Sequence, residues 1–235
     1  MRKSTILGLA AGILSAGAVI AGTYAHSTAG PSPSNESTLS DSDREALHKQ
    51  LRAEAIKRDE AFLTSFTQNA KDPRRLDRVF LSEAVRAPRD STTRAVNDAA
   101  IVAVGKVQDQ AYRLDSTGFV WTYSTVAIET SSKGNPGNVV VVRQVGGPAF
   151  GDHGGVQAPF LLASESNPPI FVGDRRLMFL LEVGKGLYEL QAYTGQYALD
   201  GTAVRAVSQE NPLKSRFDGR TINEVEVEVR ELAKR

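Results

Sequence analysis

Two adjacent side chains, Asp152 and His153, are the residues of this sequence whose types are suited to acid–base chemistry. A carboxylate beside an imidazole can hold and transfer a proton near neutral pH, as a hydrolase requires. The pair lies in a segment rich in glycine and proline, residues 146–169, which we predict to be a long irregular loop. A secreted hydrolase centred on Asp152 and His153 is therefore one hypothesis for the function.

The sequence around this pair lacks the other groups that hydrolysis needs. The run Gly151–Gly155 resembles the segment around the nucleophile of serine proteases, but His153 stands at the position of the serine. The remaining histidines show no spacing typical of a metal site. We therefore predict no catalytic residue, no metal and no cofactor, and we keep Phe150, Asp152 and His153 as candidates for ligand binding.

A stripe of aromatic residues is the stronger candidate for recognition. Phe119, Trp121 and Tyr123 alternate along a predicted strand, so their side chains share one face. On the outside of a small barrel, such rings can stack on sugars, on bases or on the prolines of a peptide. The alternative is that an amino-terminal helix covers these rings through Phe62 and Phe66.

The composition excludes several classes of function. Lysine and arginine number 28 and aspartate and glutamate 27, so the net charge of +1 gives no sign of a nucleic-acid partner. The chain has no cysteine, which excludes disulfides, thiolate metal sites, a cysteine nucleophile and the acylated cysteine of a bacterial lipoprotein. A hydrophobic content of 41% is ordinary for a folded soluble protein.

The amino-terminal segment has the pattern of an export signal. Two basic residues precede the apolar run 6–20, and small residues follow up to Ala25, after which a signal peptidase could cleave. Residues 5–24 are also about long enough to span a bilayer as a single uncleaved anchor. Both interpretations predict an exported protein, secreted or anchored at the cell surface. Residues 26–41 are rich in serine and proline and predict a disordered linker.

A helical segment and a connector are predicted over residues 42–95. The run Ser42–Glu45 has the form of a capping box, and apolar residues recur at helical spacing to about Asn69. We expect a second helical turn from residue 74 to residue 84, followed by a surface connector over residues 86–94.

Residues 96–235 predict a β-barrel-like domain. Strand patterns recur along it, and a hairpin covers residues 171–193, with a first strand that is apolar on both faces. Because the strands follow one another through turns, without helices between them, we expect a small antiparallel barrel. Residues 221–235 fit a strand of alternating valines and also a helix that begins with a capping box, and the capping residues favour the helix.

Four stretches of this domain carry a resemblance to known proteins: residues 99–107, 119–134, 139–147 and 172–180. Their pattern resembles a group of exported bacterial proteins with an oligonucleotide/oligosaccharide-binding-like (OB-like) barrel. That barrel is related in shape to the netrin-like module of tissue metalloproteinase inhibitors. Those inhibitors act through an amino-terminal cysteine, which this chain lacks. The resemblance therefore implies a fold, mainly β with flanking helices, and implies no mechanism.

We expect an exported, non-catalytic binding or interaction module at the cell envelope. Its partner would be an envelope protein or polymer, and not nucleic acid. The first alternative is the hydrolase centred on Asp152 and His153. The second is an accessory subunit that positions a membrane partner.

Overall fold

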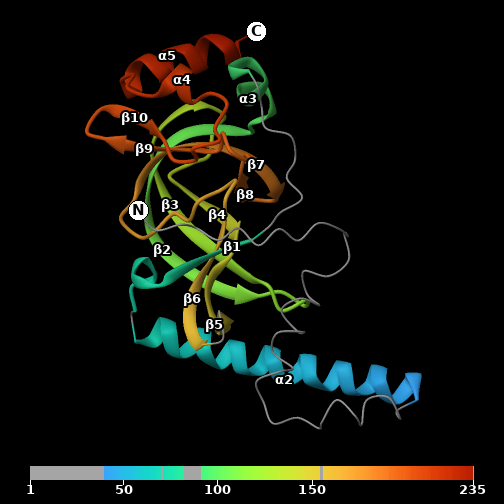
Figure 1. The fold of residues 1–235 in the computed structure, drawn as a ribbon. Helices are drawn as coiled ribbons and strands as arrows, with labels where there is room; N and C mark the ends of the chain where they lie inside the picture. The colour runs from blue at the N-terminus through green and yellow to red at the C-terminus, as the bar shows by residue number, and fades with distance from the viewer. Residues whose placement is uncertain (1–39, 70, 82–90, 154–155, 235) are drawn as a thin grey trace. The chain divides into compact units, whose positions relative to one another are not determined.

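The computed structural model describes residues 40–69, 71–81, 91–153 and 156–234 (Figure 1). The chain divides into two units, residues 1–55 and 56–235. The predicted signal peptide or membrane anchor and nearly all of the predicted linker lie outside the described residues. Within the described ranges, no helix has both the length and the apolar composition needed to cross a membrane.

The first helix, α2 (Asp41–Gln68), confirms that the predicted segment is helical and shifts its start. The Ser40 side chain accepts a hydrogen bond from the backbone N–H of Asp43 at 3.2 Å, so Ser40 caps the helix in place of the predicted Ser42. In the second half of α2, Leu63 and Phe66 are buried.

The predicted second helical turn is wrong. Pro73 opens a short 3-10 helix, η2 (Pro73–Arg75), and the chain then forms strand β1 (Asp77–Leu81). β1 pairs in parallel with β6 (Val156–Ser164), so pairing with a distant strand overrides the weak local helical preference. The end of the predicted connector forms a further helix, α3 (Thr92–Asp98), which Ser91 caps.

Five strands close a barrel. β2 pairs with β3 and β7, β3 with β4, and β7 with β8, all antiparallel, while β4 and β8 pair in parallel and complete the ring. This OB-like ring confirms the predicted fold class, although the parallel pair departs from a wholly antiparallel barrel. The bounds are β2 (Ile101–Leu114), β3 (Val120–Lys133), β4 (Val139–Val145), β7 (Arg175–Gly184) and β8 (Leu187–Leu190). Strands β9 (Gln196–Asp200) and β10 (Ala203–Ala206) extend the sheet beyond β7.

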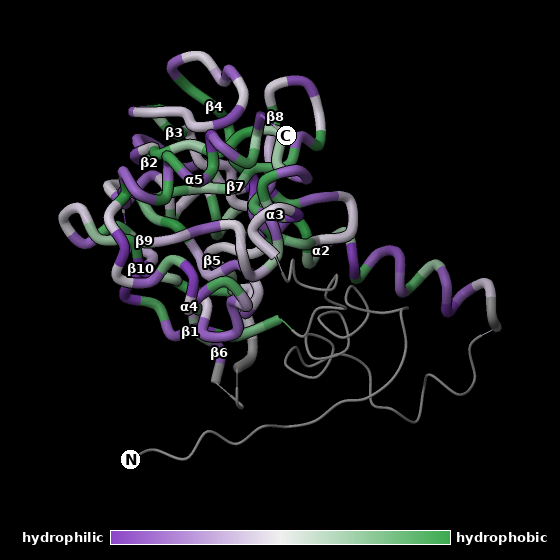
Figure 2. The backbone as a smooth tube through the Cα atoms, turned by 90° about the horizontal axis from the view of Figure 1, so that it is seen from above, coloured by the Kyte–Doolittle hydropathy of each residue, from purple (hydrophilic) through white to green (hydrophobic). Residues whose placement is uncertain are grey.

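Strand β7 is buried on both faces, as its sequence predicts. Met178 and Leu180 face the barrel interior, where they pack with the inward side chains of β2, β3 and β4. Leu177 and Phe179 face the opposite way, into a second core that includes residues of α3, α4 and α5. Figure 2 shows hydrophobic stretches within the strands and hydrophilic ones in the loops that project from them.

The ambiguous carboxyl-terminal segment is a helix, α5 (Ile222–Ala233), which follows the short helix α4 (Lys214–Phe217). Thr221 and Glu224 form the predicted capping box. Val225 and Val229 are fully buried, whereas Val227 is 54% exposed. A strand would have placed all three valines on one face, so helical spacing decides which of them reach the core.

The predicted irregular loop at residues 146–169 is wrong over most of its length. β5 (Gly147–His153) and β6 form an antiparallel hairpin, and with β1 they make a separate three-stranded sheet. The chain passes from β4 to β5 through Gly146, whose φ of 101° suits glycine and whose added Cβ would lie 2.3 Å from the Leu162 carbonyl oxygen. Gly146 therefore lets the chain pass close to the backbone of β6, and it does not mark an irregular loop.

Candidate binding face of the barrel

The predicted aromatic stripe lies on the outer face of β3. The alternate residues Val120, Thr122 and Ser124 are buried and face inward, whereas Trp121 and Tyr123 are half-buried. Because side chains alternate along a strand, the two rings share the outward face of the barrel.

Each of these rings lies under an arginine from a neighbouring strand. The guanidinium carbon of Arg143, on β4, is 4.9 Å from the ring centroid of Trp121. That of Arg113, on β2, is 5.2 Å from the centroid of Tyr123. In the strand register Arg113 is opposite Trp121 and Arg143 is opposite Tyr123, so the two stacked pairs cross diagonally. We call these four residues the aromatic face.

Two carboxylates hold the aromatic face in place. Glu189, on β8, accepts a hydrogen bond from Arg143 Nε at 2.6 Å. Asp115 accepts one from Trp121 Nε1 at 3.2 Å. Asp115 also accepts bonds from the backbone N–H groups of Thr117 and Phe119, and so fixes the turn between β2 and β3. These contacts restrain the indole of Trp121 and the guanidinium of Arg143.

The pKa of Asp115 lies below its ordinary value of 3.8. Burial alone would raise it, but hydrogen bonds from Thr117, Phe119 and Trp121 to the carboxylate outweigh that effect. A carboxyl whose pKa is lowered in the folded state stabilises the fold above its unfolded pKa, and this contribution is lost as pH falls through the folded pKa.

We therefore expect acid to release Trp121 from Asp115 at a pH below 3.8. Trp121 is the only tryptophan of the chain, so its fluorescence reports the change directly. The wild-type protein should show a fluorescence transition in this pH range that is missing from the Asp115→Asn variant. Identical acid titrations of the two proteins would contradict the assignment.

Phe119 directly precedes β3, at the end of the turn from β2. It is half-buried, and within the described residues its ring makes no aromatic contact with Trp121 or Tyr123. Of the three predicted rings, Trp121 and Tyr123 are the two that lie within β3 and beneath an arginine. Sequence reasoning missed the two arginines that stack on them.

The helix α2 packs elsewhere. Phe62 lies 5.6 Å from Phe150, and Phe66 lies 6.2 Å from Tyr112, measured between ring centroids. Tyr112, on β2, is opposite Thr122 in the strand register. Its side chain therefore lies on the same side of the sheet as the inward-facing Thr122. In the part of the chain that the structure describes, the two helix phenylalanines therefore contact Phe150 and Tyr112 rather than the aromatic face.

The other predicted site residues lie on β5. Phe150 joins the hairpin to α2 through its contact with Phe62. Asp152 and His153 pair with Gln157 and Val156 at the end of the hairpin, and their side chains lie outside the described structure. Among the described residues, no group of three or more histidine, aspartate or glutamate side chains could hold a metal ion.

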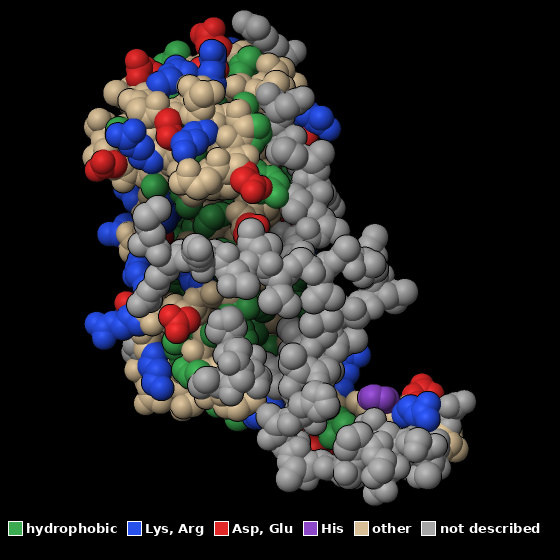
Figure 3. All heavy atoms as spheres, in the orientation of Figure 1, with side chains coloured by type: hydrophobic (Ala, Val, Ile, Leu, Met, Phe, Trp, Pro, Cys, Tyr) green, Lys and Arg blue, Asp and Glu red, His purple; other side chains and the backbone are tan. Residues whose placement is uncertain are grey.

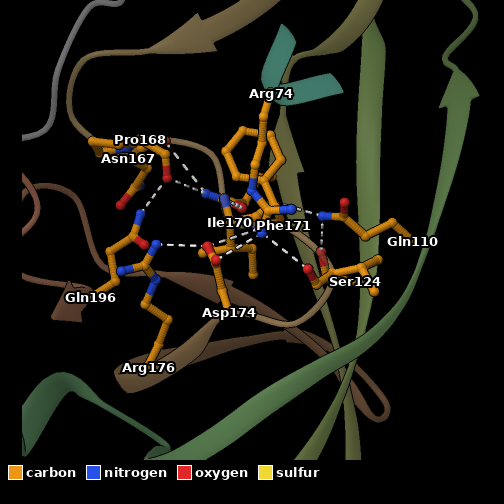
Figure 4. Close-up of polar contacts among 12 residues, drawn as sticks. Arg74, Gln110, Ser124, Asn167, Pro168, Ile170, Phe171, Asp174, Arg176 and Gln196 are labelled. Carbon is orange, nitrogen blue, oxygen red and sulfur yellow. Dashed lines mark hydrogen bonds and ion pairs between the residues drawn. The ribbon is translucent and has the colours of Figure 1, made fainter. Parts of the chain in front are cut away.

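A second polar cluster lies inside the barrel, around the chain segment between β6 and β7 (Figure 4). Gln144 accepts a hydrogen bond from Ile170 N at 3.3 Å and donates one to the Pro168 carbonyl at 3.3 Å. Gln110 donates to the Ile170 carbonyl at 2.7 Å and to Ser124 Oγ at 3.0 Å. Inward-facing polar residues on the strands would have signalled this cluster in the sequence.

Asp174 ties the same segment to η2 and β7. It accepts hydrogen bonds from Phe171 N at 3.1 Å, from Arg74 at 3.0 Å and from Arg176 at 2.6 Å. Arg74 also lies over the Phe171 ring, 4.9 Å from its centroid. The small pocket beside this segment has room for about one water molecule. The cluster therefore holds the segment in place and offers little space for a ligand.

Comparison with known proteins does not assign the chain to a family. The chain matches no protein-family model, and no curated protein matches it.

Proposed function

We propose that the protein is a non-catalytic binding module of the cell envelope and that it binds its partner with the aromatic face. The observation that carries the proposal is the half-buried pair of Trp121 and Tyr123, each stacked with an arginine on the outside of the barrel. Export, predicted from the amino-terminal segment, gives the module its location.

The position of these residues on the barrel supports the proposal. In OB folds, the face of the second and third strands and the loops beside it bind oligosaccharides and oligonucleotides. Counted around this ring, β3 and β4 are the second and third strands, and they carry Trp121, Tyr123 and Arg143. Asp115 orders the loop between the first and second strands, next to Trp121.

The chemistry of the face also suits binding. Tryptophan, tyrosine and arginine are the residues that most often dominate binding energy at interfaces. Here hydrogen bonds and ring contacts already fix Trp121 and Arg143, so little side-chain entropy remains to be lost when a partner binds.

The Trp121→Ala variant tests this function. Binding of the purified protein to the envelope fraction of its host should weaken at least tenfold, because the substitution removes a central aromatic anchor. The assay is cosedimentation over a range of envelope concentrations, with circular dichroism to show that the variant is folded. Phe80→Ala is the matched control, since Phe80 is a 50% exposed aromatic residue on β1, in the other sheet. Equal binding by Trp121→Ala and wild type would refute the proposed face.

A further inference from the structure

We infer that the ligand of the aromatic face is an acidic polysaccharide, a chain of sugars that carries carboxylate or phosphate groups, and that Arg113 recognises its charge. This inference rests on the proposed function of the face and names the chemical class of its ligand.

Arg113 is held in place but not engaged by an acceptor. Its side chain is exposed, and its guanidinium lies over the Tyr123 ring. Across the described ranges of the chain, this guanidinium donates no hydrogen bond and forms no ion pair. A guanidinium carries five N–H donors in a planar fork that matches the two oxygens of a carboxylate or phosphate. The ring contact fixes one face of this group and leaves its donor edges available.

Arg143 supplies a second set of donors beside the first. Its Nε is bonded to Glu189, while its terminal amino groups have no protein acceptor among the described residues. The two guanidinium groups cover rings that lie two residues apart on β3, a spacing of roughly 7 Å along the strand. A linear polymer with repeated anionic groups can contact both arginines at once.

The charge at this surface favours an anion. The carboxylates of Glu189 and Asp115 are both engaged, the first by Arg143 and the second by the turn and by Trp121. Asp109 lies further along β2, opposite Thr125. Asp109 is exposed and shares the outward side of β2 with Arg113, so a carboxylate also flanks Tyr123, on the side away from Trp121. Beside Trp121, the charge without an ion-pair partner among the described residues is the positive charge of Arg113. On the side of the molecule that Figure 3 shows, acidic and basic side chains are interspersed over the upper part.

Apolar side chains beside the arginines favour a sugar chain over other polyanions. Val141 and Val145 are half-buried on the outward side of β4, which also carries Arg143. Their methyl groups offer apolar surface beside the two arginines for the C–H faces of sugar rings. The phosphates of a nucleic acid would also pair with the two arginines. The predicted export of the chain, however, separates the protein from nucleic acids.

The test is titration of the full chain with four defined polymers: polygalacturonate, phosphomannan, dextran and single-stranded oligo(dT). We expect binding to at least one of the two acidic polysaccharides, which weakens as salt is raised, and no binding to dextran. Arg113→Gln should weaken this binding at least tenfold. Arg113→Lys should recover only part of it, because lysine keeps the charge and loses the fork. Arg205→Gln is the matched control, since Arg205 is an exposed arginine on strand β10.

Several results would overturn the inference. One such result is that dextran binds as tightly as the acidic polymers and that Arg113→Gln leaves its binding unchanged. This result would show that the protein does not recognise the charge of the polymer. Tighter binding of oligo(dT) would assign the face to nucleic acid. If no polymer binds but Trp121→Ala still abolishes binding to the envelope fraction, the ligand class is wrong and the binding face stands. If that fraction is not bound either, both proposals fail.

Discussion

Replacement of Phe179 by alanine is expected to lower the free energy of unfolding by about 3–5 kcal/mol. Phe179 is fully buried, and its ring centroid lies 5.9 Å from that of Tyr197 and 6.2 Å from that of Phe217. These three rings join the sheet to the carboxyl-terminal helices, so the substitution leaves a cavity at the centre of that core. For a chain of this size the loss corresponds to a fall in melting temperature of roughly 6–20 °C, measurable by circular dichroism.

Phe80→Ala provides the control for this experiment. Phe80 is 50% exposed, so the same change in side chain should cost less than about 1 kcal/mol. A stability of the Phe179→Ala variant within about 1 kcal/mol of wild type would contradict the packing described for β7.

Asp174→Ala is expected to lower the free energy of unfolding by about 3 kcal/mol, near the lower end of the range for a broken buried ion pair. Asp174 is the ion-pair partner of Arg176, whose side chain is only 15% exposed and whose Nε has no hydrogen-bond acceptor in the described structure. Removal of the carboxylate leaves this guanidinium charge uncompensated. It also frees the Phe171 N–H and the partly exposed Arg74. Urea unfolding of the variant and the wild type gives the difference.

Two comparisons separate this effect from the loss of any surface ion pair. Glu129→Ala breaks the neighbouring exposed pair with Arg175 and should cost less than about 1 kcal/mol. The double variant Asp174→Ala/Arg176→Met should recover part of the lost stability, because it removes the unpaired charge. If Asp174→Ala lowers the free energy of unfolding no more than Glu129→Ala does, the uncompensated charge of Arg176 does not destabilise the variant.

The parts of the fold that could be predicted are those in which local signals agree. Four successive valines, residues 139–142, favour a strand, and β4 begins at the first of them. Asp200-Gly201 is a strong two-residue turn signal, and β9 and β10 pair across it. The apolar run of β7 predicts its burial on both faces. In each of these elements side-chain preference, turn chemistry and burial favour the same structure.

The errors arose where distant pairing decides the structure. The β5–β6 hairpin contains Pro148 and Pro159, and Gly146 and Gly147 precede or open it, so its local pattern is typical of a loop. β6 also pairs with β1, a strand that is far away in the sequence and has a weak strand signal of its own, and no local pattern specifies this pairing. The same holds for the parallel pairing of β4 with β8, since no local pattern specifies which strands close the ring.

Two of the four residues of the aromatic face could be predicted from the sequence. Strict alternation along β3 placed Trp121 and Tyr123 on one face. The stacked arginines depend on how the strands are aligned, and the register of β2 against β3 shifts between Val107 and Asp109. That irregularity determines which residues of β2 lie opposite the rings, and it sets Arg113 beside Trp121. Residue types alone do not reveal a shift of one position.

The closure of the ring by β8 also governs the order in which the barrel can form. The contact between Arg143 and Glu189 joins residues 46 positions apart, with the whole β5–β6 hairpin and β7 between them. Loop-closure entropy must be overcome before this pair forms, so we expect closure of the ring to come late in folding. Until then β4 presents an unpaired edge, and the folding chain is most exposed to aggregation in this interval.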